Sequence, residues 1–251
     1  MKQVEVAVIG TGWCGGIRAE TLARSALVDK LHICEIRPDR LAEVKALTRP
    51  ASATLDYRDI LKNPDISVVY VCTTPEQNHY PITRDCLKAG KHVLLEKPIA
   101  MELWEADELI TLAKRGQLKF TIGGGWNLPP SYPNYCTTWV EITGTEGALI
   151  LDDTHREHWL NTVSGGTQFP MSTMPGEQVD HVFAGQMGPE TIHFLESVIL
   201  DRPVMVTPES ARMVMETYTA ADLSAERNEP VDLPLSNEAL AAIADMRGAK
   251  P

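Results

Sequence analysis

The sequence predicts an α/β protein in which an N-terminal doubly wound parallel sheet is followed by a reduced α+β part with a short antiparallel sheet and helices. Two observations carry this prediction. Up to residue 123, short apolar runs alternate strictly with helical patterns, as in a parallel sheet with helices on both faces. Beyond that residue the alternation stops, and the pattern of an antiparallel hairpin begins.

The N-terminal strands are expected where compact apolar runs end in glycine or polar residues, because strands buried on both faces have near-continuous apolar sequences. These runs lie at residues 4–9, 31–36, around 53, 67–72, 92–95 and 119–122. Amphipathic patterns predict helices at residues 17–25, 38–47, 57–61, 80–89 and 103–115. Right-handed crossovers then give a doubly wound sheet, which we delimit as a domain of residues 1–123.

Residues 124–251 are expected to form a second, shortened α+β domain. Residues 136–143 alternate between polar and apolar side chains, and residues 148–151 return as a partner strand after a Gly-rich turn. Thr207 and Pro208 have the residue types of a helix cap and first position. The remaining expected elements are a long loop over 161–188, helices over 189–200 and 208–227, a strand at 231–235 and a short helix after Ser236.

Composition narrows the class of protein. The chain has 251 residues and a net charge of −11, which argues against broad contact with nucleic acid. Its five cysteines form no CxxC pair, which favours reduced thiols and a cytoplasmic protein. We expect no signal peptide, no membrane segment and no metal site, since no apolar run approaches ~20 residues and no ligand cluster has metal-binding spacing.

Glycines directly after the first apolar run predict a dinucleotide site. Gly10, Gly12 and Gly15 form a G-x-G-x-x-G motif between a strand and a helix, with Trp13 and Cys14 inside it. The first glycine permits a tight turn, the second lets the backbone approach a pyrophosphate, and the third lets the helix pack on the sheet. The N–H groups at the helix N-terminus would then bind the phosphates of NAD or NADP.

Two residues at the end of the second predicted strand bear on which cofactor is bound. Glu35 lies twenty positions after Gly15, where a carboxylate is expected to bind the adenosine ribose hydroxyls. This carboxylate favours NAD because it would repel a 2′-phosphate. Arg37 could instead bind such a phosphate, so NADP stays open.

Two further segments complete a resemblance to a known family. Residues 71–79 (VCTTPEQNH) and 95–100 (LEKPIA), together with the glycine motif, resemble the glucose–fructose oxidoreductase / inositol dehydrogenase family, Gfo/Idh/MocA. Residues 141–147 (EITGTEG) resemble the family's late hairpin, and residues 194–226 its C-terminal helices. The resemblance covers most of the chain.

The resemblance implies roles for matching residues. Lys97 would be the catalytic-site lysine, and Glu96 would lie near the nicotinamide ribose. A lysine at this edge of the sheet could hydrogen-bond a substrate hydroxyl and stabilise the alkoxide that develops during hydride transfer. The positions expected along the nicotinamide half of the cofactor are Thr73, Thr74, Pro75, Asn78 and His79.

The sequence departs from the family after residue 123. The central part of the C-terminal domain is missing, including the Asp-x-x-x-His motif that supplies a general acid/base. Four histidines are alternative sources of this group, and His181 is the strongest, ahead of His155, His158 and His193. Trp126, Trp139 and Trp159 could stack on a sugar ring or serve as core residues.

These patterns leave two functions open. One is an NAD(P)-dependent dehydrogenase that transfers a hydride between the nicotinamide and a sugar, an inositol or a similar small polyol or carbonyl compound. The other is a shortened relative, with an internal deletion, that binds the cofactor without turnover. A sheet that has lost strands exposes an edge and an apolar face, so we expect a homo-oligomer formed through the C-terminal sheet.

Overall fold

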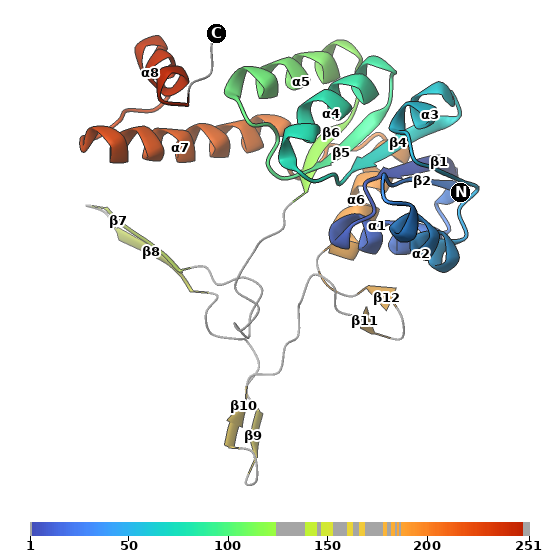
Figure 1. Cartoon of the computed structure of the whole chain (residues 1–251). Coiled ribbons are helices and arrows are strands. Elements are labelled where there is room, and N and C mark those ends of the chain that lie inside the picture. The colour runs from blue at the N-terminus through green and yellow to red at the C-terminus, as the bar shows by residue number, and fades with distance from the viewer. Residues whose placement is uncertain are drawn as a thin grey trace. The chain divides into compact units, whose positions relative to one another are not determined.

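The structure is a computed structural model, and it describes residues 2–123, 139–144, 147–152, 160–162, 166–168, 178–179, 182–183, 185 and 187–247. The chain divides into two units. Figure 1 labels the helices and strands of the described residues. One unit comprises residues 1–123 and 191–251, and the other comprises residues 124–190. In the described part of the chain, no helix is long and apolar enough to cross a membrane.

A six-stranded parallel sheet forms the centre of the first unit. Its strand order is β3-β2-β1-β4-β5-β6, the order of a Rossmann sheet, as the sequence predicted. The order reverses between β1 and β4, and the carboxyl ends of these two strands mark the switch point where such sheets bind ligands. The strands are β1 (Val4–Ile9), β2 (Val28–Cys34), β3 (Ser52–Thr54), β4 (Ile66–Val71), β5 (His92–Glu96) and β6 (Phe120–Gly123).

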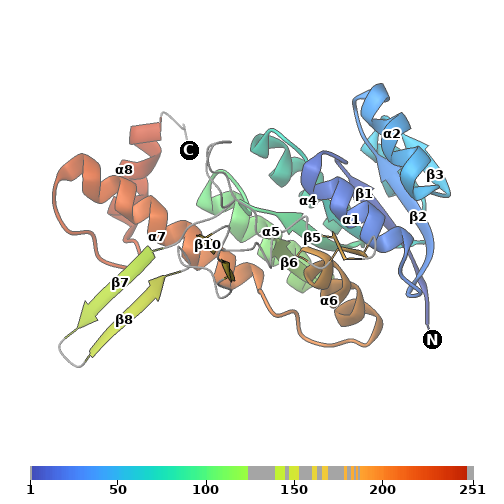
Figure 2. The same ribbon diagram turned by 90° about the horizontal axis from the view of Figure 1, so that it is seen from below.

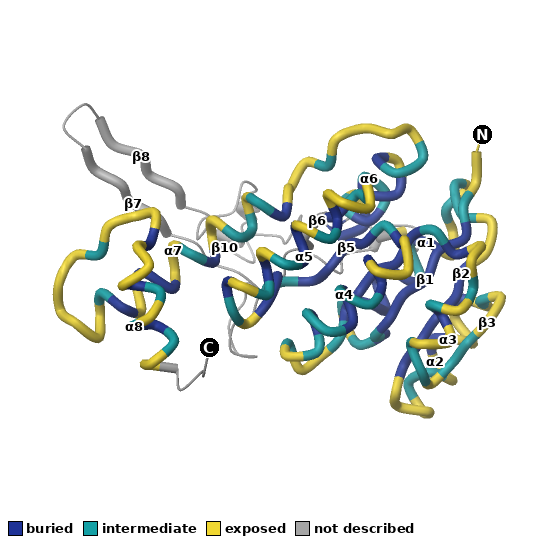
Figure 3. The backbone as a smooth tube through the Cα atoms, turned by 90° about the horizontal axis from the view of Figure 1, so that it is seen from above, coloured by how far each residue is buried: buried dark blue, intermediate teal, exposed yellow. Residues whose placement is uncertain are grey.

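Helices cover both faces of this sheet and create two separate apolar cores (Figure 3). The core under α1 (Trp13–Ala23) and α2 (Pro38–Thr48) contains Val6, Val8, Leu22 and Phe194. The opposite core contains Ile9, Val71 and Leu95 from the strands. It is covered by α3 (Tyr57–Lys62), α4 (His79–Lys88) and α5 (Leu103–Arg115), with the 3₁₀ turn η1 (Glu76–Asn78) before α4.

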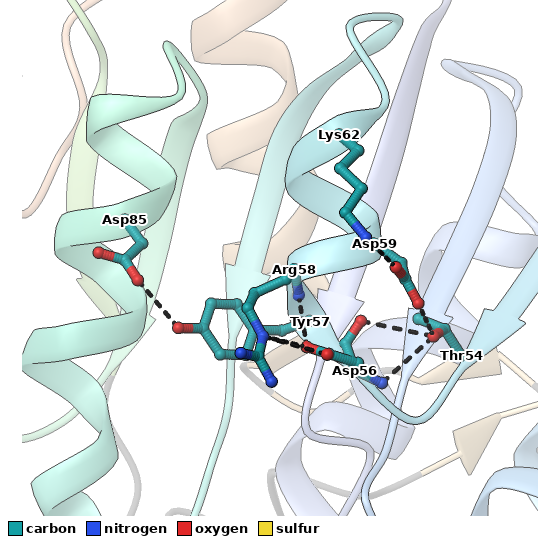
Figure 4. Close-up of polar contacts among 7 residues, drawn as sticks. All are labelled: Thr54, Asp56, Tyr57, Arg58, Asp59, Lys62 and Asp85. Carbon is teal, nitrogen blue, oxygen red and sulfur yellow. Dashed lines mark hydrogen bonds and ion pairs between the residues drawn. The ribbon is translucent and has the colours of Figure 1, made fainter.

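The corner between β3 and α3 shows how polar side chains fix a short helix (Figure 4). The Asp56 carboxylate accepts the Arg58 backbone N–H at 2.9 Å and so caps α3. The Thr54 hydroxyl donates to the Asp59 carboxylate at 2.8 Å, and the Tyr57 hydroxyl donates to Asp85 of α4 at 2.9 Å. These bonds attach the edge strand to the helical layer.

The helices after residue 190 pack on the Rossmann part of the chain. Residues 191–199 of α6 (Met187–Ile199) contribute Phe194 and Leu195 to the core under α1. Helix α7 (Pro208–Arg227) lies against α5 and carries α8 (Asn237–Arg247) (Figure 2). Two ion pairs join α7 to α5, from Lys114 to Glu209 at 2.8 Å and from Arg212 to Asp107 at 2.7 Å. The expected division into domains 1–123 and 124–251 stays a prediction.

The predicted cap of α7 is present, and the strand predicted at 231–235 is absent. Thr207 accepts the Ser210 N–H at 3.2 Å, and Pro208 occupies the first helical position. No strand forms over residues 231–235, where Pro234 lacks the N–H that a sheet ladder requires.

The second unit contains three two-stranded antiparallel ladders among its described residues. The largest is the hairpin of β7 (Trp139–Gly144) and β8 (Gly147–Asp152), which pairs Glu141 with Ile150. It lies where the alternating pattern predicted a hairpin. The expectation that this hairpin belongs to a reduced domain with its own sheet stays a prediction. The other ladders are β9 (Leu160–Thr162) with β10 (Gly166–Gln168), and β11 (Gln178–Val179) with β12 (Val182–Phe183).

Candidate cofactor and active site

Three loops meet at the carboxyl edge of the sheet, where the switch point lies. They follow β1, β4 and β5 and contain the glycine turn, residues 72–78 and residues 97–100. Backbone hydrogen bonds hold the start of each of the first two loops. The Gly10 N–H donates to the Cys34 carbonyl, and the Cys72 N–H donates to the Ile9 carbonyl, each at 2.8 Å.

Each glycine of the first loop meets the physical demand that the motif predicts. Gly10 has a φ of +82°, and a Cβ there would lie 2.7 Å from the Cys72 carbonyl oxygen. A Cβ on Gly15 would lie 1.9 Å from the Gly10 carbonyl oxygen, so the helix can approach the strand only without a side chain. By contrast, a Cβ on Gly12 would have no atom within 4 Å. The open space is therefore at the glycine over which a pyrophosphate would lie.

The N-terminus of α1 offers donors to an anion. Gly12 is the N-cap residue, no side chain caps the helix, and no acidic residue lies in its first turn. The N–H groups of this turn and the helix dipole therefore favour a negatively charged ligand. Trp13 is half exposed and Cys14 partly exposed beside these groups.

Glu35 is buried at the end of β2, where the sequence placed the ribose-binding carboxylate. Its Oε2 atom accepts the Thr11 backbone N–H at 2.8 Å and the Thr11 hydroxyl at 3.3 Å. Its Oε1 atom accepts the Arg37 backbone N–H at 3.2 Å. The carboxylate thus lies directly beside the glycine turn, and the mostly exposed Arg37 side chain extends next to it at 3.4 Å.

Arg40 of α2 also contacts the glycine turn, and no motif in the sequence predicts this contact. Its Nε atom donates to the Thr11 carbonyl at 2.7 Å, and its Nη2 atom donates to the Gly12 carbonyl at 3.2 Å. The guanidinium therefore fixes the backbone of the turn from the side of α2. The contact crosses 28 residues of sequence, and only the position of Arg40 on a helix beside the turn could have suggested it.

His79 joins the second and third loops. Its imidazole is buried, with Nδ1 2.8 Å from the Pro98 carbonyl oxygen and Nε2 2.8 Å from the Thr73 carbonyl oxygen. The ring thus contacts the two loops themselves, and its expected contact with a cofactor stays a prediction. Thr74 and Pro75 are exposed and Asn78 is partly buried in the same loop. The buried Thr73 hydroxyl has no hydrogen-bond partner within the described residues, and its expected contact with the cofactor stays a prediction.

The Glu96–Lys97–Pro98 segment follows β5 at the same edge. Glu96 is buried and Lys97 is partly buried. The Glu96 Oε1 atom accepts two hydrogen bonds from the Arg18 guanidinium of α1, from Nε at 2.9 Å and from Nη2 at 2.5 Å. A charged pair thus lies directly under the segment that carries the candidate catalytic lysine.

Two cysteines near this edge, Cys34 and Cys72, are poorly suited to nucleophilic chemistry. Burial raises the pKa of the Cys34 thiol to about 12 and that of Cys72 well above its ordinary value. Thiols with raised pKa values hold little thiolate at neutral pH and are inert. The four described cysteines form no disulfide with one another, and the expected reduced state stays a prediction.

The candidate general acid/base His181 lies outside the described residues, as do His155, His158, Trp126 and Trp159. The fourth histidine, His193, lies on α6, where its Nε2 atom accepts the Met205 backbone N–H at 3.1 Å. His193 thus binds the backbone of the segment after α6, which is far in sequence from the three loops. In the described ranges, no group of His, Cys, Asp or Glu residues could hold a metal ion.

Comparison with known families agrees with this geometry. The model of the oxidoreductase family with an NAD-binding Rossmann fold, Gfo/Idh/MocA, matches residues 4–123. Residues 4–123 belong to this family. The family predicted from residues 71–79 and 95–100 is therefore confirmed, and the domain is an NAD-binding Rossmann domain.

Similar curated proteins include inositol dehydrogenases. The myo-inositol 2-dehydrogenase of Thermotoga maritima is 31% identical over 115 residues, which cover 46% of this chain and 34% of the relative. The inositol 2-dehydrogenase/D-chiro-inositol 3-dehydrogenase of Lactiplantibacillus plantarum is 32% identical over 133 residues, covering 51% of this chain and 37% of the relative. The chain thus spans about a third of the length of the curated relatives it matches.

Solved structures share the fold. The scyllo-inositol dehydrogenase from Lactobacillus casei, with bound NAD(H) and scyllo-inositol, superposes with a TM-score of 0.70 at 17% sequence identity. The superposition covers 91% of this chain and 98% of that one. GenD2 from gentamicin A biosynthesis, in complex with NAD, gives a TM-score of 0.71 at 18% identity over 91% of this chain and 96% of that one.

The residues present fit a nicotinamide dinucleotide. The space over Gly12 and the uncapped turn of α1 suit a pyrophosphate, and Glu35 beside that turn suits the adenosine ribose. The partnerless buried hydroxyl of Thr73 supplies a polar group on the other side of the switch point. The adenosine and nicotinamide halves would therefore extend to opposite sides of the glycine turn.

Proposed function

We propose that the protein is an NAD(P)-dependent dehydrogenase that transfers a hydride between the nicotinamide and a sugar, an inositol or a similar small polyol or carbonyl compound. One observation carries the proposal: Lys97 follows a β5 strand whose end lies at the same sheet edge as the glycine turn and Glu35. Inositol dehydrogenases among the relatives of residues 4–123 support the substrate class.

The nicotinamide, when bound, accepts or supplies the hydride. The chain has to hold the reacting oxygen and move its proton. The Lys97 ammonium can donate a hydrogen bond to that oxygen and stabilise the negative charge that develops on it. When the alcohol is oxidised, its hydroxyl proton goes either to His181 or to Lys97 in its neutral amine form, a contribution typically worth ~10²–10⁴-fold in rate.

The cofactor contacts belong to the same proposal. Glu35 would bind the adenosine ribose and favour NAD, whereas Arg37 beside it would favour NADP if its guanidinium turned to a 2′-phosphate. Equal affinities for the two cofactors would contradict the role of Glu35. The residues proposed to contact the cofactor are Gly10, Gly12, Trp13, Cys14, Gly15, Glu35, Arg37, Thr73, Thr74, Pro75, Asn78, His79, Glu96 and Lys97.

The test uses the whole chain in two steps. Calorimetry measures the binding of NAD and of NADP, and absorbance at the reduced-nicotinamide band then follows turnover with a panel of inositols and sugars. We expect NAD to bind and at least one polyol to be oxidised. Lys97→Ala should abolish turnover and weaken NAD binding far less, whereas the control Lys88→Ala, on the exposed face of α4, should change neither.

A second candidate function is a cofactor-binding protein without turnover. It is favoured by the absence of an Asp-x-x-x-His motif between Gly123 and Glu141 in the sequence. Binding of NAD together with no oxidation of any polyol, and no reduction of the corresponding ketones by NADH, would select this function over the first.

We also propose that the protein acts in the cytoplasm as a homo-oligomer joined through its C-terminal sheet. Helix α7 supports association, because its Met213, Val214 and Tyr218 side chains are exposed and apolar. Sedimentation velocity should give a mass of two or more chains. A monomer at micromolar concentration would refute this part of the proposal.

A further inference from the structure

A completely buried arginine lies between the cofactor helix and the segment that carries Lys97. Arg18 has no exposed side-chain surface, and the Glu96 side chain is 7% exposed. Taking two charges out of water costs several kcal/mol per ion unless their geometry and further hydrogen bonds compensate. Such a pair adds little net stability compared with apolar residues, so its position in the fold suggests another role.

The guanidinium contacts two elements outside its own helix, β5 and α6. Two of its nitrogens donate to Glu96 at the end of β5, and Nη1 donates to the Thr191 hydroxyl of α6 at 2.8 Å. The Thr191 carbonyl in turn accepts the Tyr70 hydroxyl of β4 at 2.9 Å. The Tyr70 ring packs edge-on against Phe194 of α6, with ring centroids 5.7 Å apart.

These contacts fix one end of the Glu96–Lys97–Pro98 segment, and His79 fixes the other. Arg18 holds the Glu96 carboxylate, while His79 contacts the Pro98 carbonyl. Lys97 lies between the two fixed residues. Arg18 lies on α1, the helix whose first turn forms the candidate pyrophosphate site. The same helix therefore contacts the Glu96–Lys97–Pro98 segment and offers N–H groups to the pyrophosphate.

We propose that Arg18 is a positioning residue that sets the nicotinamide end of the site. Arg18 orients the Glu96 carboxylate and so fixes the positions of Glu96 and Lys97 relative to α1. Its hydrogen bond to Thr191 also connects α1 to α6. The proposal rests on the proposed function, because it assumes that the nicotinamide half of the cofactor lies beside Glu96. The adenosine half, held by Glu35 and the glycine turn, does not depend on this contact.

The test compares two ligands that share their adenosine half. NADH contains the nicotinamide, and ADP-ribose lacks it. Arg18→Lys keeps the charge but cannot form the same fork to Glu96 and Thr191. We expect its affinity for NADH to fall about tenfold, the equivalent of one lost charge-assisted hydrogen bond, and its affinity for ADP-ribose to stay within about twofold. The fluorescence maximum of bound NADH should shift towards that of free NADH.

Two further variants complete the design. Arg18→Met combined with Glu96→Gln removes both charges, which avoids leaving a buried charge unpaired and keeps the test open if a single variant does not fold. It should show the same selective loss of NADH affinity. Arg24→Met, on the exposed end of the same helix, should bind both ligands as the unaltered protein does.

The outcomes separate the two proposals. If both ligands lose affinity equally in the Arg18 variants, or neither does, Arg18 has only a structural role and the inference is wrong. If the unaltered protein binds ADP-ribose but not NADH, the proposed function fails, whatever the variants do.

Discussion

At the scale of single residues, a substitution in the glycine turn can weaken cofactor binding without destabilising the fold. Gly12→Ala adds a methyl group to open space, so we expect the free energy of unfolding to change by less than about 0.5 kcal/mol. The same methyl group would lie between the backbone and the pyrophosphate. NAD affinity should therefore fall at least about tenfold, the equivalent of ~1.4 kcal/mol. Urea unfolding and calorimetry measure the two effects.

Gly15→Ala is the matched comparison. Its methyl group would overlap the Gly10 carbonyl, so the chain has to shift, and overpacking of this kind costs about 1–3 kcal/mol or more. A loss of stability in Gly12→Ala equal to that in Gly15→Ala would contradict the assignment of Gly12 to the ligand.

Some site residues were predictable from the sequence and others were not, because only some of them are defined by local structure. Gly10, Gly15 and Glu35 were predictable because local backbone demands and a fixed spacing define them. Arg18 and Arg40 act on backbone or carboxylate groups that are 78 and 28 residues away, respectively. Their partners are set by packing, which no local pattern encodes.

At the scale of elements, the N-cap of α7 gives a direct test. Thr207→Ala removes the hydroxyl that accepts the Ser210 N–H, so we expect a loss of about 1 kcal/mol in the free energy of unfolding. Thr217→Ala in the exposed middle of the same helix is the control. Its loss should be no more than a few tenths of a kcal/mol, because alanine has the higher helix propensity. Equal losses in thermal melts would show that Thr207 does not act as a cap.

The junction of β5 and β6 makes stability depend on pH. The Nδ1 atom of His92 accepts the Lys119 backbone N–H at 2.9 Å, which requires an unprotonated Nδ1. Burial, and then the Lys119 ammonium, lower the pKa of His92 in the folded protein. The unfolded chain therefore takes up a proton that the folded chain resists. This contribution to stability is complete above the unfolded pKa of about 6.5 and is lost as the pH falls below it.

The corresponding experiment measures urea unfolding between about pH 7.5 and 5.5. A single group changes stability by at most about 1.4 kcal/mol per pH unit. His92→Gln lacks the titrating group and should lose less stability than the unaltered protein over this range. The same loss in both proteins would contradict the role of His92.

Elements were predictable where one physical signal dominated. The buried strands have near-continuous apolar runs, and the segment that contains β7 alternates between polar and apolar residues, so the sequence predicted both. At residues 231–235, the apolar and polar residues also alternate, but Pro234 removes a ladder donor and the strand does not form. The backbone chemistry of one residue outweighed the side-chain pattern.

At the scale of the whole molecule, the least predictable feature is the packing of residues 191–251 on the Rossmann part of the chain. An amphipathic pattern identifies α6 and α7 as helices, but it does not say which apolar face they cover. Phe194 and Leu195 complete the core under α1, while Met215 and Leu223 of α7 join the core on the opposite face. Both cores therefore depend on segments far apart in the sequence.

This arrangement predicts how cofactor binding spreads through the molecule. A ligand that binds only the folded state, at about 100 times its Kd, raises the free energy of unfolding by ~2.7 kcal/mol. Arg18 joins the cofactor helix to Thr191, so hydrogen exchange with saturating NAD should slow at the amides of residues 191–199 as well as at the glycine turn. Residues 237–247 of α8, which pack on α7, provide the internal comparison and should change less.

In Arg18→Met combined with Glu96→Gln, NAD should still protect the glycine turn from exchange but should no longer protect residues 191–199. If NAD protects residues 191–199 equally with and without the guanidinium, the coupling runs through the apolar contacts of Phe194 instead.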